Sequence, residues 1–151
     1  KEFGEIFGRY YSPVERYKSE GAKTLLLTVG SYSETAKMVI DERQAEGESI
    51  GLVRLRLWRP FPFEEFRQAV KDAETLIVFE RCISSGMGGA IFSEVRSALY
   101  DEEKKPKVVN IIGGLGGRDM PIKDFKYVID RGRRIAEEGS KEVIETVGIR
   151  G

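Results

Sequence analysis

The chain has 151 residues, and its 25 lysines and arginines balance 25 aspartates and glutamates, so its formal net charge is zero. A chain of this length is typical of a single domain with a core of its own. The balanced charge gives no basic surplus that would favour nucleic acid or a membrane surface as partner. Charged residues make up 33% of the sequence, more than is usual, which is typical of the ion-pair networks of heat-adapted proteins.

The sequence contains no histidine and one cysteine, Cys82. Disulfides, zinc fingers, cysteine-ligated iron–sulfur clusters and imidazole-based catalysis therefore cannot be built within this chain. No apolar run approaches the roughly 20 residues that span a bilayer, and the first residues lack a signal-peptide pattern. We expect a cytoplasmic protein. The chain begins at Lys1 without a methionine, and we expect it to be part of a longer polypeptide.

Residues 1–18 predict an arm or linker, and residues 19–151 predict the α/β domain. Aromatic residues and breaks such as Gly4 and Pro13 occur in the arm without a sustained helical or strand period. We expect the arm to pack its aromatic side chains on a neighbour. A short turn of helix is expected near Val14 to Lys18.

Four short apolar runs predict buried parallel strands, and apolar residues at helical spacing follow each of them. Gly132 falls on the apolar face of the last helix and permits close packing there. Ser31 and Glu34 have the spacing of a capping box for the first helix, with Ser33 as the alternative cap. Asp119 is a candidate cap for the last helix. The strands are Thr24 to Gly30, Ile50 to Leu57, Thr75 to Phe79 and Pro106 to Ile112, and the helices run to about Glu46, from Phe63 to Val70, from Ile91 to Leu99 and from Ile122 to Ala136.

The alternation of strands and helices predicts a doubly wound α/β sandwich around a parallel sheet of four central strands. The loops after the strands must then collect along one edge of the sheet, where ligands usually bind in such folds. Two of these loops are rich in glycine.

The two glycine loops are candidates for phosphate binding through backbone N–H groups at a helix N-terminus. Neither loop matches GxGxxG or GxxxxGK[ST], so we favour turns that let the helices dock. The candidate phosphate-binding residues are Arg81, Gly86, Gly88, Gly89, Gly116, Gly117 and Arg118.

Other residues at the strand ends favour contact with protein. Trp58, Arg59 and Phe61 lie on a stiff turn with two prolines, and arginine with aromatic side chains is typical of protein interfaces. A planar ligand is the alternative for this turn. Glu80 and Arg81 predict a structural ion pair and contact residues, with an acid and its pKa-tuning partner as the alternative.

No pair of carboxylates, no triad and no metal cluster emerges from the sequence, so we predict no catalytic residue and no metal site. Cys82 could be a nucleophile only if Arg81 or the helix dipole activated it, and we expect an inert, packed thiol.

The order of these motifs resembles a known family. LLLTVGSYSETAK is followed by GLVRLRLWRPFP, then by LIVFERCISSGMGGAIFSEV, and then by IGGLGGRDMPIKDF. From about Gly8 to Gly132 the chain is similar to the second domain of the alpha chain of 2-oxoacid:ferredoxin oxidoreductases, most of all pyruvate:ferredoxin oxidoreductase. The same order recurs in the C-terminal domains of transketolase and of the pyruvate dehydrogenase beta subunit.

The resemblance implies a three-layer α/β/α sandwich with an additional antiparallel edge strand from around Tyr10 to Val14. It also implies a parent enzyme that decarboxylates a 2-oxoacid on thiamine diphosphate with magnesium, passes electrons through iron–sulfur clusters to ferredoxin, and forms an acyl-coenzyme A. In the family these cofactors are held by other domains and subunits, so the resemblance implies no cofactor in this domain.

We therefore expect a non-catalytic structural domain that is inactive alone and serves assembly, with its strand-end edge toward other domains and subunits of the oxidoreductase. The alternative is a module that binds phosphate or coenzyme A through the two glycine loops and Arg81 or Arg118.

Overall fold

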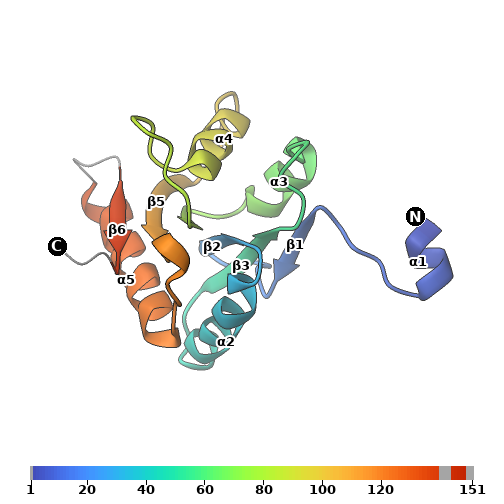
Figure 1. Cartoon of the computed structure of the whole chain (residues 1–151), viewed down its shortest axis with the longest axis horizontal. Coiled ribbons are helices and arrows are strands. Elements are labelled where there is room, and N and C mark those ends of the chain that lie inside the picture. Colours follow the sequence, from blue (N-terminus) through green and yellow to red (C-terminus); the bar gives the residue numbers. More distant parts are fainter. Residues whose placement is uncertain (1, 140–143, 149–151) are drawn as a thin grey trace.

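The computed structural model describes residues 2–139 and 144–148. Over these residues it is an α/β sandwich with a six-stranded sheet in the order β1-β3-β2-β4-β5-β6 (Figure 1). The elements are α1 (Glu2–Phe7), β1 (Val14–Tyr17), β2 (Thr24–Val29), α2 (Tyr32–Ala45), β3 (Ile50–Leu55), α3 (Phe63–Val70), β4 (Thr75–Glu80), α4 (Ala90–Ala98), β5 (Lys107–Gly113), the 3-10 turn η1 (Leu115–Gly117), α5 (Ile122–Glu138) and β6 (Glu145–Val147).

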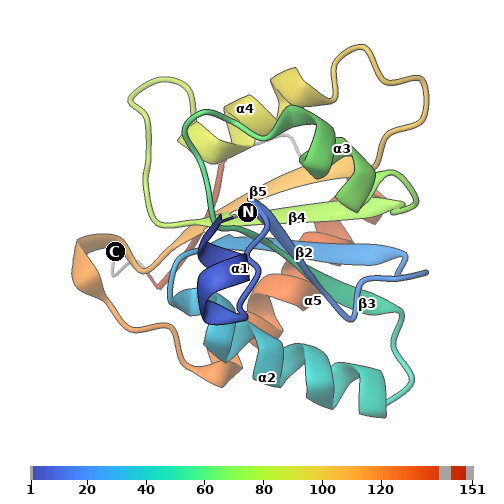
Figure 2. The ribbon, with the colours of Figure 1, turned by 90° about the vertical axis from the view of Figure 1, so that its right-hand side faces the viewer.

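The sheet is parallel except at one edge, where β1 pairs antiparallel with β3. α2 and α5 cover one face of the sheet, and α3 and α4 cover the other (Figure 2). The central strands are largely apolar because both of their faces are buried. The predicted three-layer sandwich, its four central strands and its antiparallel edge strand are confirmed. Within the described part of the chain, no helix is both long and apolar enough to cross a membrane.

Gly132 sets how closely α5 lies against the sheet. A Cβ at this position would stand 2.6 Å from Cδ1 of Ile77 on β4. A larger residue would require the Ile77 side chain or the helix to shift, because real Cβ atoms do not make contacts this short. The close packing predicted from the apolar face of this helix is confirmed.

The prediction of a helical turn from Val14 to Lys18 is wrong. Val14 to Tyr17 form β1, whose first residue pairs with Leu55, and the edge strand thus begins where it was expected to end. Alternating burial is the signal of a strand, but a pattern of four residues is too short to identify a strand from the sequence. The helix of this region is α1, in the arm. β6 was not predicted, since three residues carry no readable period.

The predicted helix caps are confirmed only in the position of Ser31. Ser31 is the N-cap residue of α2, but its side chain makes no hydrogen bond to the helix, and the Ser33 hydroxyl lies 2.8 Å from the Thr28 hydroxyl in the core. α5 begins after Pro121 instead of after Asp119. In α2 the serine side chain meets a buried threonine, and that contact outweighs the local capping preference.

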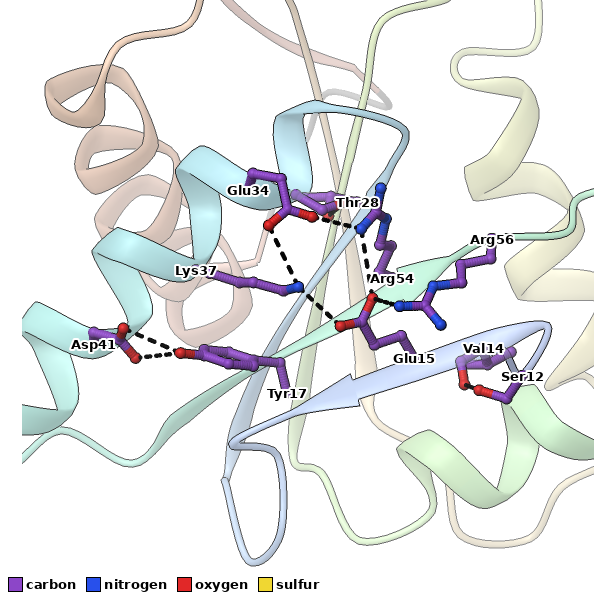
Figure 3. A network of polar contacts seen from close by, with 11 residues as sticks. Ser12, Val14, Glu15, Tyr17, Thr28, Glu34, Lys37, Asp41, Arg54 and Arg56 are labelled. Carbon is purple, nitrogen blue, oxygen red and sulfur yellow. Dashed lines mark hydrogen bonds and ion pairs between the residues drawn. The ribbon is translucent and has the colours of Figure 1, made fainter. Parts of the chain in front are cut away.

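A cluster of charged side chains fastens the edge strand β1 to the rest of the fold (Figure 3). Glu15 accepts hydrogen bonds from Lys37 Nζ at 2.8 Å and from Arg56 Nη2 at 2.7 Å. Arg54 Nη1 lies 3.5 Å from Glu15 and 2.6 Å from Glu34 on α2. Because Glu15 is only 18% exposed, these contacts are shielded from water, and they tie β1 to both β3 and α2.

Glu15 is expected to make stability depend on pH. Burial raises the pKa of Glu15, but the hydrogen bond from Lys37 and the charges of Lys37, Arg56 and Arg54 outweigh it and lower that pKa. A carboxyl group with a depressed pKa stabilises the fold above its unfolded-state pKa, and this contribution is lost as the pH falls through the folded-state pKa.

We therefore expect Glu15→Gln to lower the free energy of unfolding at neutral pH by about 1 to 2 kcal/mol. The difference from the wild type should shrink toward zero in strong acid, where Glu15 is protonated in both states. Urea unfolding at neutral and acid pH measures both effects. Glu20→Gln, at an exposed carboxylate of the next turn, is the control. If Glu15→Gln lowered the free energy of unfolding equally at both pH values, the ionised Glu15 carboxylate would not be the source of the stabilisation.

Candidate functional site

The carboxyl ends of β2, β3, β4 and β5 meet along one edge of the sheet, as predicted, and the loops that follow them lie there (Figure 2). Ligands bind at this edge in many α/β folds. The side chains of the four loops therefore define the candidate site.

Glu80, the last residue of β4, is the buried centre of this edge, with 2% of its surface exposed. Its Oε2 accepts the backbone N–H of Ile91 at 2.9 Å, and its Oε1 accepts that of Phe92 at 3.1 Å. Asn110 Nδ2 donates to Oε1 at 2.9 Å, and the Cys82 thiol donates to Oε2 at 3.4 Å. Glu80 thus caps α4 from a neighbouring strand, because it satisfies N–H groups that have no partner within the helix.

Gly89 is required by this arrangement. A Cβ at this position would stand 1.6 Å from Oε1 of Glu80. The backbone N–H of Gly89 donates to Oδ1 of Asn110 at 3.1 Å, so Asn110 bridges the loop and the carboxyl group. At Gly89 the backbone of this glycine loop therefore comes close to the protein's own carboxyl group.

The predicted ion pair between Glu80 and Arg81 is wrong. Successive residues of an extended chain point to opposite faces of the sheet, so Glu80 turns toward α4 on one face and Arg81 turns toward Tyr32 on the other. The Arg81 guanidinium donates to the carbonyl oxygen of Gly114 at 3.2 and 3.3 Å and lies 4.4 Å from the ring centroid of Tyr32. Being buried, Glu80 is also not the exposed contact residue that the sequence indicated, whereas Arg81 is exposed.

Cys82 has the features of an unreactive thiol. Burial raises its pKa, and the hydrogen bond to Glu80 and the charge of that residue raise it further. Since only the thiolate is a nucleophile, a raised pKa lowers reactivity at neutral pH. This agrees with the expected inert, packed thiol.

The second glycine loop closes around Tyr32. Its hydroxyl donates to the carbonyl oxygen of Arg118 at 2.5 Å, and the Arg118 guanidinium donates to the carbonyl oxygen of Gly148 after β6. Gly116 and Gly117 have positive φ and are exposed. Of the phosphate candidates, Arg81 and Arg118 are thus brought together through Tyr32. Gly86, Gly88 and Gly89 lie on the other loop, where Gly88 and Gly89 are buried and Gly86 is exposed.

The aromatic turn after β3 docks on α4. The Trp58 indole N–H donates to Glu94, and the Arg59 guanidinium pairs with the same carboxylate. Arg59 also stacks over Trp58, with 4.7 Å between the guanidinium carbon and the ring centroid. Phe61 packs inward, 5.4 Å from the ring of Phe66. Arg59 remains 63% exposed and Trp58 is half-buried.

The residues that sequence reasoning missed are the partners of the predicted ones. Asn110 joins the loop after β4 to β5, Glu94 joins the turn after β3 to α4, and Tyr32 joins the loops that follow β4 and β5. Asn110 offered one signal, because it is a polar residue inside an otherwise apolar strand, and a buried polar group needs a partner.

The chain's residues do not fit the cofactors that the resemblance implies for the parent enzyme. An iron–sulfur cluster of that kind is held by several thiolates, and the chain has one cysteine. In the part of the chain that the structure describes, no three Cys, Asp or Glu side chains gather as ligands for a metal such as magnesium. The start of α4, which could hold a diphosphate, is already filled by Glu80.

The fold is that of the transketolase-like α/β domains. A split gene transketolase, an inactive beta4 tetramer, matches with a TM-score of 0.61 and 16% identity over 85% of this chain and 44% of the other. The 2-oxoglutarate:ferredoxin oxidoreductase from Magnetococcus marinus, with 2-oxoglutarate, coenzyme A and succinyl-CoA bound, matches with a TM-score of 0.59 and 18% identity over 89% of this chain and 21% of the other.

Within this class, the chain belongs to the family of pyruvate:ferredoxin oxidoreductase core domain II, which matches residues 22–125. It is 37% identical over 150 residues to the pyruvate synthase subunit PorA of Pyrococcus furiosus, a match over 99% of this chain and 38% of the relative. It is 36% identical over 140 residues to the ketoisovalerate oxidoreductase subunit VorA of Pyrococcus horikoshii, over 92% of this chain and 36% of the relative. The chain thus spans less than half the length of these relatives. Relatives from thermophiles fit the expectation of a heat-adapted protein.

We expect Glu80→Gln to destabilise the fold although it conserves the size and shape of the side chain. An amide has one carbonyl oxygen and two N–H donors, so at least one backbone N–H of α4 would face a donor. The free energy of unfolding should fall by about 2 to 4 kcal/mol.

Denaturant unfolding measures this loss. Glu102→Gln is the matched control, because Glu102 pairs with Arg67 at the surface and is 40% exposed. It should cost less than about 1 kcal/mol. If the two variants lowered the free energy of unfolding equally, the hydrogen bonds of Glu80 to α4 would not be important for the stability of the fold.

Proposed function

We propose that this chain is the non-catalytic second domain of the alpha chain of a 2-oxoacid:ferredoxin oxidoreductase. It serves assembly by presenting the carboxyl-end edge of its sheet to neighbouring domains and subunits. The observation that carries this proposal is the orientation of the groups at the edge. The groups that could bind a ligand are engaged within the protein, while apolar and arginine side chains face outward.

The groups that a phosphate site would use already have hydrogen-bond partners within the protein. The first N–H groups of α4 are bonded to Glu80, and the guanidinium groups of Arg81 and Arg118 donate to backbone carbonyl oxygens. A ligand would have to displace these contacts, whose buried members are costly to leave without a partner.

The outward groups have the composition of a protein contact. Arg59 is exposed and stacked over Trp58, and Arg81 is exposed and stacked over Tyr32. Both arginines are held in place by their aromatic partners, so less conformational entropy is lost when a partner binds. Exposed apolar residues of the same loops add to this surface, namely Leu57, Phe63, Ile83 and Met87. We take Trp58, Arg59, Phe61 and Arg81 as the centre of the contact. Phe61 packs inward against Phe66 and supports the turn.

The parent enzyme that we propose oxidatively decarboxylates a 2-oxoacid to an acyl-coenzyme A. Pyruvate is the substrate we favour, since most of the similar relatives are named pyruvate synthase subunits. Thiamine diphosphate, magnesium and iron–sulfur clusters would be held outside this chain, and ferredoxin and coenzyme A would bind the whole complex. We propose the cytoplasm as its location, and an arm at 1–18 before the domain at 19–151.

Arg59→Ala is expected to weaken association of the complete alpha chain with its partner subunits about tenfold or more. Arg59 is exposed, so its truncation should leave the fold of the isolated chain nearly unchanged. Native mass spectrometry across a dilution series measures the association. The matched control is Arg134→Ala, at an exposed arginine of α5 near the opposite edge of the sheet. Equal behaviour of the two variants would count against this edge as the contact. Pyruvate oxidation by the 151-residue chain alone, with all cofactors added, would refute a non-catalytic domain.

A binding module for coenzyme A is the second candidate, and the observation that favours it is the exposed run of Gly116 and Gly117 beside Arg118. If it were correct, millimolar coenzyme A would raise the melting temperature by several degrees, because a ligand that binds only the folded state stabilises it. Arg118→Ala would abolish that rise. If the domain serves assembly alone, coenzyme A should not raise the melting temperature of the wild type or of the Arg118→Ala variant. This is the outcome that we expect from differential scanning fluorimetry.

A further inference from the structure

Residues 2–13 form an arm that stands apart from the α/β sandwich. Figure 1 shows α1 well beyond the edge strand β1, joined to it by an extended segment. The arm is organised by its own aromatic rings, with Phe3 centred 4.7 Å from Phe7 and 5.9 Å from Tyr11. Tyr10 lies against Gly4, where a Cβ would stand 2.4 Å from its ring. The arm therefore has a defined shape that the sandwich does not impose on it.

The arm exposes most of its apolar surface. A helix of six residues is too short to be stable in water, so its order requires contacts outside itself. Its charged residues Glu2, Glu5 and Arg9 balance nearly to neutrality, and Arg9 lies over the ring of Phe3. The contact that the arm can offer is therefore apolar. The exposed fractions are 47% for Phe3, 73% for Ile6, 57% for Phe7, 73% for Tyr10 and 59% for Tyr11.

The last residue of the arm, Pro13, is hydrogen-bonded to the segment that follows β3, and from there the arm runs away from the sheet. The carbonyl oxygen of Pro13 accepts the backbone N–H groups of Arg56 at 2.8 Å and of Leu57 at 3.1 Å. The Arg56 guanidinium lies 5.1 Å from the ring centroid of Tyr11 and also pairs with Glu15. The arm thus leaves from the end of β3, next to the exposed Leu57.

We propose that the aromatic face of this arm packs against another folded domain of the same polypeptide. This inference rests on the proposed function, since it takes the chain to be one domain of a longer alpha chain. Curated relatives support that premise, because the chain covers only 38% of the pyruvate synthase subunit of Pyrococcus furiosus.

The size of the surface favours a contact within one polypeptide. The five exposed side chains offer roughly 600 Å², which is less than the roughly 800 Å² per partner of a stable interface between separate molecules. A contact within one chain needs less area, because the link keeps the two surfaces at a high effective concentration. A second copy of this chain is therefore the less favourable occupant.

Cleavage by chymotrypsin, which cuts after aromatic residues, tests the proposal on the isolated full-length alpha chain and on the 151-residue chain. We expect cuts in the arm to be at least about tenfold slower in the full-length alpha chain, because its aromatic side chains are covered there. The double variant Phe3→Ser with Phe7→Ser should restore fast cleavage after Tyr10 and Tyr11. The matched control is Glu2→Gln with Glu5→Gln, which changes the same helix on its polar positions and should keep the protection.

Each other result overturns the proposal. Equal rates in both chains would leave the arm without a partner in the alpha chain. Protection that appears only after partner subunits are added would assign the arm to another subunit. Protection of the 151-residue chain that grows with its concentration would assign it to a second copy. The association of the Arg59→Ala variant is measured separately. If that variant associates more weakly while the arm of the full-length alpha chain is not protected, this inference fails and the proposed function stands.

Discussion

The candidate site depends on one buried carboxyl group. Glu80 ends β4, caps α4 and bonds Asn110 on β5, so one side chain joins two strands and a helix. Glycine is the only residue type that fits at position 89 against the Glu80 carboxyl group. Because Glu80, Asn110 and Gly89 share hydrogen bonds or direct contact, their substitutions should be strongly non-additive. Sequences that change one of these positions would be expected to change the others with it.

This carboxyl group explains why a glycine-rich loop at a strand end need not bind phosphate. The loop, the strand end and the helix N-terminus are the same elements that nucleotide-binding folds use. Here the anion at the helix N-terminus is supplied by the protein itself. The loop consequently has a fixed shape without any ligand, which suits a surface for other domains.

The central fold could be predicted because its signals are long. Apolar runs such as Leu25 to Leu27 and the apolar stripe of α5 repeat over enough residues to define a period. The bounds of the short elements α1, β1 and β6 could not be predicted, because these elements span too few residues to define a period, and β1 and β6 are ordered by contacts with distant residues. The pairing of Val14 with Leu55 is such a contact, and nothing near Val14 in sequence announces it.

The loops of the candidate site were predicted at the correct edge of the sheet, but the orientations of some side chains were not. Parallel strands must bring their loops together, so Trp58, Arg81 and Arg118 were expected at one edge, and the structure places them there. The direction of each side chain depends on its partners, and the partners of Glu80 come from another strand and from a helix. The strand period alone could have separated Glu80 from Arg81, since neighbours on a strand cannot point the same way.

The cluster around Glu15 behaves differently from the apolar core when the protein is heated. The cost of removing charged groups from water falls as the temperature rises, whereas the stabilisation from buried apolar surface levels off. The ties from Glu15 to Lys37 and Arg56 therefore gain in relative weight with heating. An edge strand is usually where a sheet begins to unfold. In this protein the edge strand β1 is held by ion pairs, whose contribution to stability weakens least as the temperature rises.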